Sequence, residues 1–323
     1  MPHNQSDATE DAQSPMAAPI GQEINISNES VVPTSPSLFE VVKTGDEAAI
    51  KAAIINEIKE LAKKHKVDEY EIVFLFDDLD SITDFHSDRL YSVLSDRSEV
   101  NDILLTVHSR GGKVEPAFLI SKTCKKIAHG KFVVAVPRKA KSAATLLALG
   151  ADEIHMGMMS QLGPIDPQIN NLPVLGLANG LTKISQLVSD YPKSAEMWAK
   201  YLTDNLSLRH LGYFERLSES ATQYAERLLE GKILPSNQTA KSLGDHFVNH
   251  YKDHSFLIDI GEARLLLGEN TVKSETVEYS FSNDVYQLFD FVGLFLKFLF
   301  KKEFYFVGNL SPESMTIREM SDE

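Results

Sequence analysis

Phe-Val-Val-Ala-Val-Pro-Arg-Lys-Ala-Lys-Ser-Ala-Ala-Thr-Leu-Leu-Ala-Leu-Gly, residues 132–150, is the stretch that decides the fold of this 323-residue chain. Its Val-rich run 132–136 is typical of a buried parallel strand. The Ala- and Leu-rich run from Ser142 to Gly150 is typical of a helix. Ser142 therefore stands at a helix start, where unpaired backbone N–H groups stabilise developing negative charge.

Ser142 has two interpretations. A serine at a helix start is commonly only an N-cap, whose hydroxyl accepts a backbone hydrogen bond. The alternative is a nucleophile, which the preceding strand 102–108 and its Ser-Arg-Gly-Gly turn favour. Gly111 and Gly112 allow the chain to turn tightly and to expose N–H groups, as in the oxyanion hole of an acyl-transfer site.

Three segments carry a family resemblance: Ser-Arg-Gly-Gly-Lys-Val-Glu-Pro-Ala-Phe-Leu-Ile (109–120), residues 135–157 around Lys-Ser-Ala-Ala-Thr, and Gln-Leu-Gly-Pro-Ile-Asp-Pro-Gln (161–168). They resemble the serine dehydrogenase proteinase family. Those proteins are serine peptidases of the ClpP/crotonase superfamily, related to signal peptide peptidase A. The resemblance is close over about 71–168 and looser over 251–259.

This resemblance implies an α/β fold, a ClpP/crotonase-like spiral of βαβ units with an added C-terminal helical region. The alternation of strands and helices along the chain independently predicts a parallel sheet with right-handed crossovers. By the same resemblance Ser142 is the nucleophile, and Gly111 and Gly112 form the oxyanion hole. Related folds assemble into rings, so a homo-oligomer is expected.

A serine hydroxyl needs a neighbouring base, and several candidates stay open. Lys183 follows Ser142 at a separation like that in the NfeD-type Ser–Lys proteases, and its apolar neighbours could keep its amine neutral. The alternative is an exposed helical lysine. His155 suits a structural role, and His108 lies at the carboxyl end of a strand, where sites gather in parallel sheets.

Other polar residues near Ser142 are expected to assist it. Asp166 would orient the base or receive a substrate N-terminus. Lys139 and Lys141 lie beside Ser142 in sequence and would reach it or bind a substrate carboxylate.

No cofactor or metal is expected. The four aspartates of loop 77–84 lack the glycine and terminal glutamate of a calcium-binding hand, so charge complementarity with a helix start is the simpler account. His246, His250 and His254 have a spacing of four, which permits a zinc site on one helix face. Gly244 just before them argues against a rigid helix there.

Charge and cysteine content narrow the class of protein. Acidic residues outnumber basic ones, 46 to 32, and the net charge of −14 disfavours a role in nucleic-acid binding. The single cysteine, Cys124, fits a reducing compartment and a core position. Residues 1–36 show no signal-peptide pattern and none of the membrane anchor found in several relatives, so a cytoplasmic location is expected.

Four regions are expected along the chain. They are a disordered segment (1–37), a ClpP/crotonase-like catalytic core (38–188), a helical cap or oligomerisation region (189–270) and an aromatic-rich extension (271–323). The Phe-rich run 285–307 is interrupted by charges and predicts a helix buried in an oligomer interface; binding flat on a membrane is the alternative.

The sequence thus predicts a serine endopeptidase that acts on peptide or protein substrates through an acyl-enzyme. Two alternatives stay open. One is an acyl-CoA hydratase or isomerase that uses the same oxyanion hole without a nucleophile. The other is a non-catalytic scaffold that kept the fold but lacks an effective base.

Overall fold

The computed structural model describes residues 37–95, 102–169, 172–206 and 208–320. Apart from Ser37, the segment expected to be disordered, 1–37, lies outside the described residues. The helices are α1 (Leu38–Lys43), α2 (Glu47–His65), α3 (Asp84–Ser95), α4 (Val114–Ile127), α5 (Ala143–Leu149), α6 (Val174–Asp190), α7 (Ala195–Asn205), α8 (Leu208–Leu229), α9 (Ala240–Asn249), α10 (Ile260–Leu267) and α11 (Val277–Phe300). The strands are β1 (Glu71–Asp77), β2 (Ile103–Ser109), β3 (Phe132–Val136), β4 (Lys139–Ala140), β5 (Glu153–Met156), β6 (Gln161–Leu162), β7 (Gln168–Ile169), β8 (Leu172–Pro173), β9 (Val272–Lys273), β10 (Lys302–Asn309) and β11 (Met315–Glu319).

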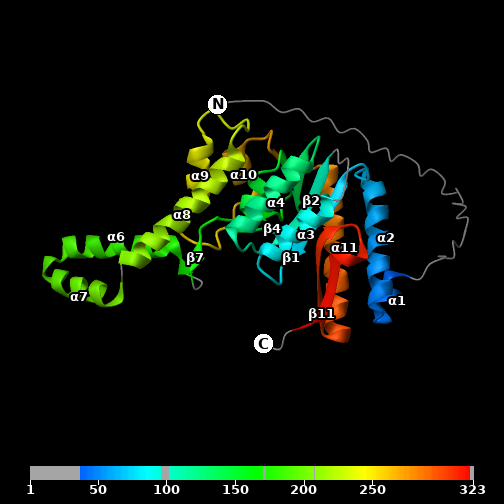
Figure 1. Ribbon diagram of the computed structural model, residues 1–323, viewed down its shortest axis with the longest axis horizontal. Helices are drawn as coiled ribbons and strands as arrows, with labels where there is room; N and C mark the ends of the chain where they lie inside the picture. The colour runs from blue at the N-terminus through cyan, green and yellow to red at the C-terminus, as the bar shows by residue number, and fades with distance from the viewer. Residues whose placement is uncertain (1–36, 96–101, 170–171, 207, 321–323) are drawn as a thin grey trace, which may run out of the picture. The chain divides into compact units, whose positions relative to one another are not determined.

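One sheet organises the described chain, and helices pack around it (Figure 1). Its strand order is β11-β10-β1-β2-β3-β5-β9. Strands β1, β2, β3, β5 and β9 run parallel, whereas β10 is antiparallel to β1 and β11. Val73, Leu105, Val134 and Ile154 form a continuous row across four parallel strands, and all four are buried. The α/β fold with a parallel central sheet is therefore confirmed.

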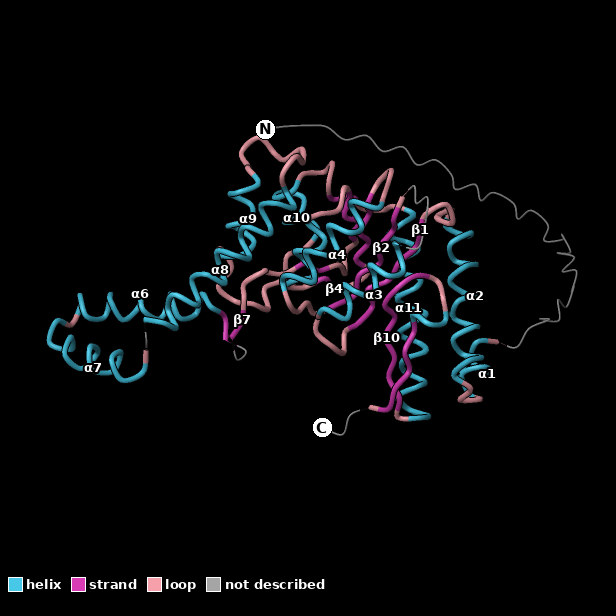
Figure 2. Tube along the Cα trace, viewed as in Figure 1, coloured by secondary structure: helices cyan, strands magenta, loops and turns pink. Residues whose placement is uncertain are grey.

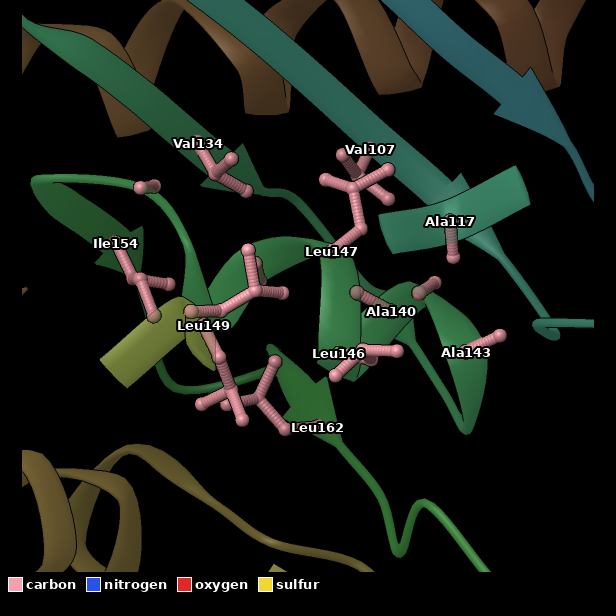
Figure 3. Packing of buried hydrophobic residues seen from close by; sticks show 14 of the residues in the cluster. Val107, Ala117, Val134, Ala140, Ala143, Leu146, Leu147, Leu149, Ile154 and Leu162 are labelled. Carbon is pink, nitrogen blue, oxygen red and sulfur yellow. The ribbon is translucent and has the colours of Figure 1, made fainter. Parts of the chain in front are cut away.

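Helices cover both faces of this sheet. Helices α3, α4, α5 and α8 contact one another on one side, and α1, α2 and α11 contact one another on the other. Every residue of α5 is buried, and its Leu146, Leu147 and Leu149 pack among Val134 and Ile154 (Figure 3). Burial of so many apolar side chains stabilises α5, because its seven residues are too few for a helix to be stable alone.

The aromatic C-terminal run differs from the prediction. The expected helix over 285–307 instead ends at Phe300, because Lys301 adopts a left-handed conformation and the chain returns as β10 beside β1. The buried Phe281 and Phe289 belong to a core cluster on one face of the sheet. Phe289 is thus buried within its own chain, whereas Phe291, Leu294, Phe298 and Leu299 of the same helix are exposed. Burial of this aromatic run in an oligomer interface therefore stays a prediction. No helix among the described residues has the length and apolar character needed to cross a bilayer.

Helices α6, α7 and the first part of α8 lie beyond the edge of the sheet (Figure 2). None of the residues of α7 is buried, and Met197 and Tyr201 leave more than half of their surface exposed. The domain limits expected at 188 and 270 stay predictions. Strands β10 and β11, from the expected extension, belong to the same sheet as the expected core.

Candidate active site

Ser142 joins β4 to α5 in a strained backbone conformation. Its φ of 51° and ψ of −121° lie where L-residues rarely sit, at a cost of about 1–3 kcal/mol. Its hydroxyl makes no capping hydrogen bond, so the interpretation of Ser142 as a mere N-cap is wrong. The residue is half-buried and lines a cavity of about 560 Å³.

Neighbouring atoms approach the two glycines of the preceding turn so closely that neither position has room for a Cβ. Gly111 has a φ of 98°, and a Cβ there would lie 2.5 Å from the Lys141 carbonyl oxygen and 2.7 Å from Ser142 Cβ. Gly112 has a φ of 155°, and a Cβ there would lie 2.3 Å from the nitrogen of Ile82. Both glycines line the cavity beside Ser142, so the turn and the serine are brought together as the sequence predicts.

The amides of this turn are not equivalent. The Gly111 N–H donates to Ser109 Oγ at 3.2 Å, which commits it to an internal bond. Among the described residues no acceptor is found for the Gly112 N–H or for the N–H of Ala143, the residue after Ser142. Gly112 lines the cavity and Ala143 directly follows Ser142, so these two N–H groups are the candidate donors to an oxyanion.

His254 and Asp166 form a hydrogen-bonded pair on the same cavity. Nδ1 of His254 lies 2.6 Å from Oδ1 of Asp166, and Asp166 is buried. Backbone bonds between Leu162 and Ile258, 2.9 and 3.1 Å long, join the β6 segment to the loop that carries His254. With a proton on Nδ1 facing the carboxylate, a neutral ring keeps the lone pair of Nε2 for a reacting group.

The sequence pattern indicates a possible role for His254 only as a zinc ligand. Helix α9 ends at Asn249, so His254 does not share a helix face with His246 and His250. Those two rings stack at 4.1 Å, whereas His254 turns to Asp166. The looser family resemblance over 251–259 was the one signal in the sequence that could have pointed to it.

The predicted lysines occupy three different settings. Lys141 lines the cavity, and its Nζ donates to the Phe256 carbonyl at 3.1 Å. Burial, and to a lesser extent Lys139, lowers the pKa of Lys141. Lys139 lies outside the cavity lining and its Nζ pairs with Asp78 at 2.6 Å. Lys183 lies exposed on α6, outside the residues that line the cavity, so the structure does not bring it to Ser142.

The two histidines that the sequence offered as alternatives, His108 and His155, lie outside the cavity lining. His108 is buried and stacks on Phe76 at 4.7 Å, and its Nδ1 has no partner among the described residues. Burial lowers the pKa of His108 to about 4. His155 is also buried, and its Nδ1 lies 2.6 Å from Thr276 Oγ1 and 3.3 Å from Glu278 Oε2. The bond from His155 is the main cause that lowers the pKa of Glu278 to about 2.

The aspartates of loop 77–84 are occupied within the protein. Asp77 accepts from the N–H groups of residues 79 and 80, Asp78 pairs with Lys139, Asp80 with Arg318 and Asp84 with Lys113. Within the described ranges no cluster of three or more His, Cys, Asp or Glu side chains could hold a metal ion.

The parallel strands β1, β2, β3 and β5, the strained serine before α5 and the glycine turn beside it lie in one continuous segment of the chain, residues 71–156. Residues 72–191 match the family described as ClpP-like SDH-type serine proteinase, so the resemblance found in the motifs is confirmed for this segment.

Individual proteins similar to this chain include a relative in sequence and two solved structures. The uncharacterized protein MJ0137 of Methanocaldococcus jannaschii is 38% identical over 163 residues, which are 50% of this chain and 51% of that protein. The chain thus spans about half the length of this curated relative. Among solved structures, a mutant of the 1510-N membrane-bound stomatin-specific protease is 13% identical with a TM-score of 0.39, covering 65% of this chain and 79% of the other. ClpP1 from Listeria monocytogenes is 12% identical with a TM-score of 0.38, covering 67% and 98%.

Proposed function

We propose that the protein is a serine endopeptidase in which Ser142 is the nucleophile, His254 the general base and Asp166 the group that orients the base. The observation that carries this proposal is the 2.6 Å contact between His254 and Asp166 on the cavity that Ser142 also lines. A serine, a histidine and a buried carboxylate in series are the parts of a triad, which is recognised by roles and not by chain order. This assignment replaces Lys183 as the base.

In the first half-reaction Ser142 Oγ attacks the carbonyl carbon of the scissile peptide bond. Its proton passes to Nε2 of His254, and the resulting imidazolium is stabilised by Asp166. The carbonyl oxygen becomes an oxyanion, for which the N–H groups of Gly112 and Ala143 are the proposed donors. Gly111 then shapes the turn, since its own N–H is bonded to Ser109.

The tetrahedral intermediate collapses when the C–N bond breaks. Nε2 of His254 returns its proton to the leaving amine, and the acyl group stays on Ser142 as an ester. Water then repeats the sequence: His254 takes a proton from water, hydroxide attacks the ester, and Ser142 regains its proton as the acid product departs. The net reaction consumes one water for each peptide bond.

The same pair of side chains separates this proposal from its alternatives. A hydratase or isomerase that used only the oxyanion hole would have no need of a histidine held by a buried carboxylate beside a strained serine. A scaffold that lacked a base would have no reason to keep this pair on the serine's cavity. The His254–Asp166 pair therefore favours hydrolysis over both. Homo-oligomer formation and a cytoplasmic location stay predictions.

Labelling with a fluorophosphonate probe tests the proposal. The wild-type chain should be labelled at Ser142, located by mass spectrometry, and Ser142→Ala should not be labelled. Ser189→Ala, which removes an exposed serine of α6, is the matched control and should label as wild type. Turnover of a CoA thioester by an unlabelled protein would instead support the hydratase.

A further inference from the structure

We infer that the cavity beside Ser142 selects substrates that carry a carboxylate near the cleaved bond, and that Lys141 and Arg110 bind it. This inference rests on the proposed peptidase function and specifies its substrate class. The feature that motivates it is an excess of positive charge at one site of an acidic protein, whose net charge is −14.

Lys141 is held in place beside the nucleophile. A Cβ at Gly163 would lie 2.7 Å from Lys141 Cδ, so the lysine stem lies closely over that glycine. The ammonium donates to the Phe256 carbonyl at 3.1 Å, which uses one of its three N–H donors. A carbonyl carries no full charge, so the charge of Lys141 has no carboxylate partner among the described residues. A carboxylate entering the cavity would supply one.

Arg110 adds a second cation on the same lining. Its Nε lies 3.1 Å from Oδ1 of Asp78, while Oδ2 of the same Asp78 accepts Lys139 at 2.6 Å. One carboxylate is thus shared by two cations, and the Arg110 side chain stays 70% exposed. Its fork has donors left for a second, incoming carboxylate.

Acidic groups of the cavity do not cancel this charge. Asp166 is the one carboxylate among the described lining residues, and it is turned to His254. Apart from Ser142 and His254, the uncharged polar side chains of the lining are the amides of Gln161 and Gln168 and the hydroxyls of Ser81 and Ser255. Because a partly buried cation interacts more strongly than one in bulk water, an anionic group is favoured here over a neutral or cationic one.

Two parts of a peptide could supply this carboxylate, a Glu or Asp side chain or the free C-terminus. The test measures binding to Ser142→Ala protein by fluorescence anisotropy. It uses three labelled peptides that are identical except at one side chain and at the C-terminus. The first has a Glu side chain and an amidated C-terminus, the second has Gln in its place and the same amide, and the third has Gln with a free C-terminus. We expect one carboxylate peptide to bind about tenfold to a hundredfold tighter than the neutral peptide, and which one does so identifies the source.

Second variants in the Ser142→Ala background assign the preference to residues. Lys141→Met should reduce the preference to within about twofold, and Arg110→Gln should reduce it in part without touching the loop of His254. Asp78→Asn should increase it, because both of its cations lose their competing carboxylate; a purely structural role predicts no such gain. Lys113→Met is the matched control, since Lys113 pairs with Asp84 outside this lining and its loss should change nothing.

Equal affinity for the three peptides, or no measurable binding of any, would overturn the inference. A preference that survives both Lys141→Met and Arg110→Gln would also overturn it. Binding to an inactive variant does not depend on catalysis, whereas fluorophosphonate labelling of the wild type reports the nucleophile. Failure of the substrate preference is thereby distinguished from failure of the proposed peptidase function.

Discussion

Nδ1 of His254 lies 2.6 Å from Oδ1 of Asp166, although 88 residues separate the two along the chain. Asp166 follows the short strand β6, and His254 lies in the loop between α9 and α10. The contact therefore joins the ClpP-like segment 72–191 to a part of the chain outside the family match. If the pair is catalytic, neither part is sufficient alone.

Substitution of the pair should separate orientation from proton transfer. We expect His254→Ala to slow fluorophosphonate labelling by roughly 10⁴-fold or more, because no base then takes the Ser142 proton. Asp166→Asn should cost about 10⁴-fold as well, because the amide donates to Nδ1 and favours the wrong tautomer. Labelling rates, with circular dichroism to confirm folding, check this result. Wild-type rates in a folded His254→Ala protein would disprove the triad.

Lys183 provides the contrast. Because it lies exposed on α6 and outside the cavity lining, Lys183→Ala should label at the wild-type rate. The same assay as for His254→Ala measures it. The reverse pattern, with Lys183→Ala inactive and His254→Ala active, would establish a Ser–Lys mechanism instead.

The glycine turn should tolerate no side chain. Gly111→Ala would place a Cβ 2.7 Å from Ser142 Cβ at a φ of 98°, so we expect a loss of roughly 3 kcal/mol in unfolding free energy. Labelling of Ser142 should fall with it, because the nucleophile is displaced. Gly180→Ala on α6 is the control, since a Cβ there would meet nothing within 4 Å and alanine is the better helix former, by about 1 kcal/mol. Denaturant unfolding should therefore give a lower unfolding free energy for Gly111→Ala and a higher one for Gly180→Ala than for the wild type.

His108 should make stability depend on pH. Its pKa falls from 6.5 to about 4 on folding, so below pH 6.5 the unfolded chain binds a proton that the native protein does not. Unfolding free energy should therefore decrease as the pH falls from 7, by about 2 kcal/mol at pH 5 from this residue. His108→Phe keeps the stack on Phe76 and should remove that part of the slope. An identical slope in denaturant titrations of wild type and variant at pH 7, 6 and 5 would refute the assignment.

Glu278, another group whose pKa is shifted, does not affect the pH dependence of stability between pH 5 and 7. The carboxyl pKa of Glu278 is lowered to about 2, so its contribution to stability is complete above its ordinary value of 4.5 and is lost as the pH falls toward 2. Measurements between pH 5 and 7 therefore report His108 without Glu278.

Local pattern was sufficient for much of the fold and part of the site. The Val-rich strands and the Ala- and Leu-rich helix between them follow from side-chain periodicity and burial, which act over a few residues. Gly111, Gly112 and Ser142 were also identified from the sequence, because a strand followed by a glycine turn, and a strand followed by a basic loop and a serine, are local features. Their approach in space follows from the parallel pairing of β2 with β4, which sets Ser109 beside Ala140.

The sequence did not determine the proposed partners of Ser142 or the position of the last strands. The sequence could not assign His254 the proposed role of base, because that role depends on a contact with Asp166, 88 residues away in the chain. Lys139 and Lys141 look alike in sequence, yet only Lys141 reaches the cavity, whereas Lys139 pairs with Asp78. The sequence by itself therefore determined the α/β core and the turn of the proposed nucleophile. The tertiary structure decided which residues lie together as the proposed base and the charges around it, because those contacts depend on long-range chain packing.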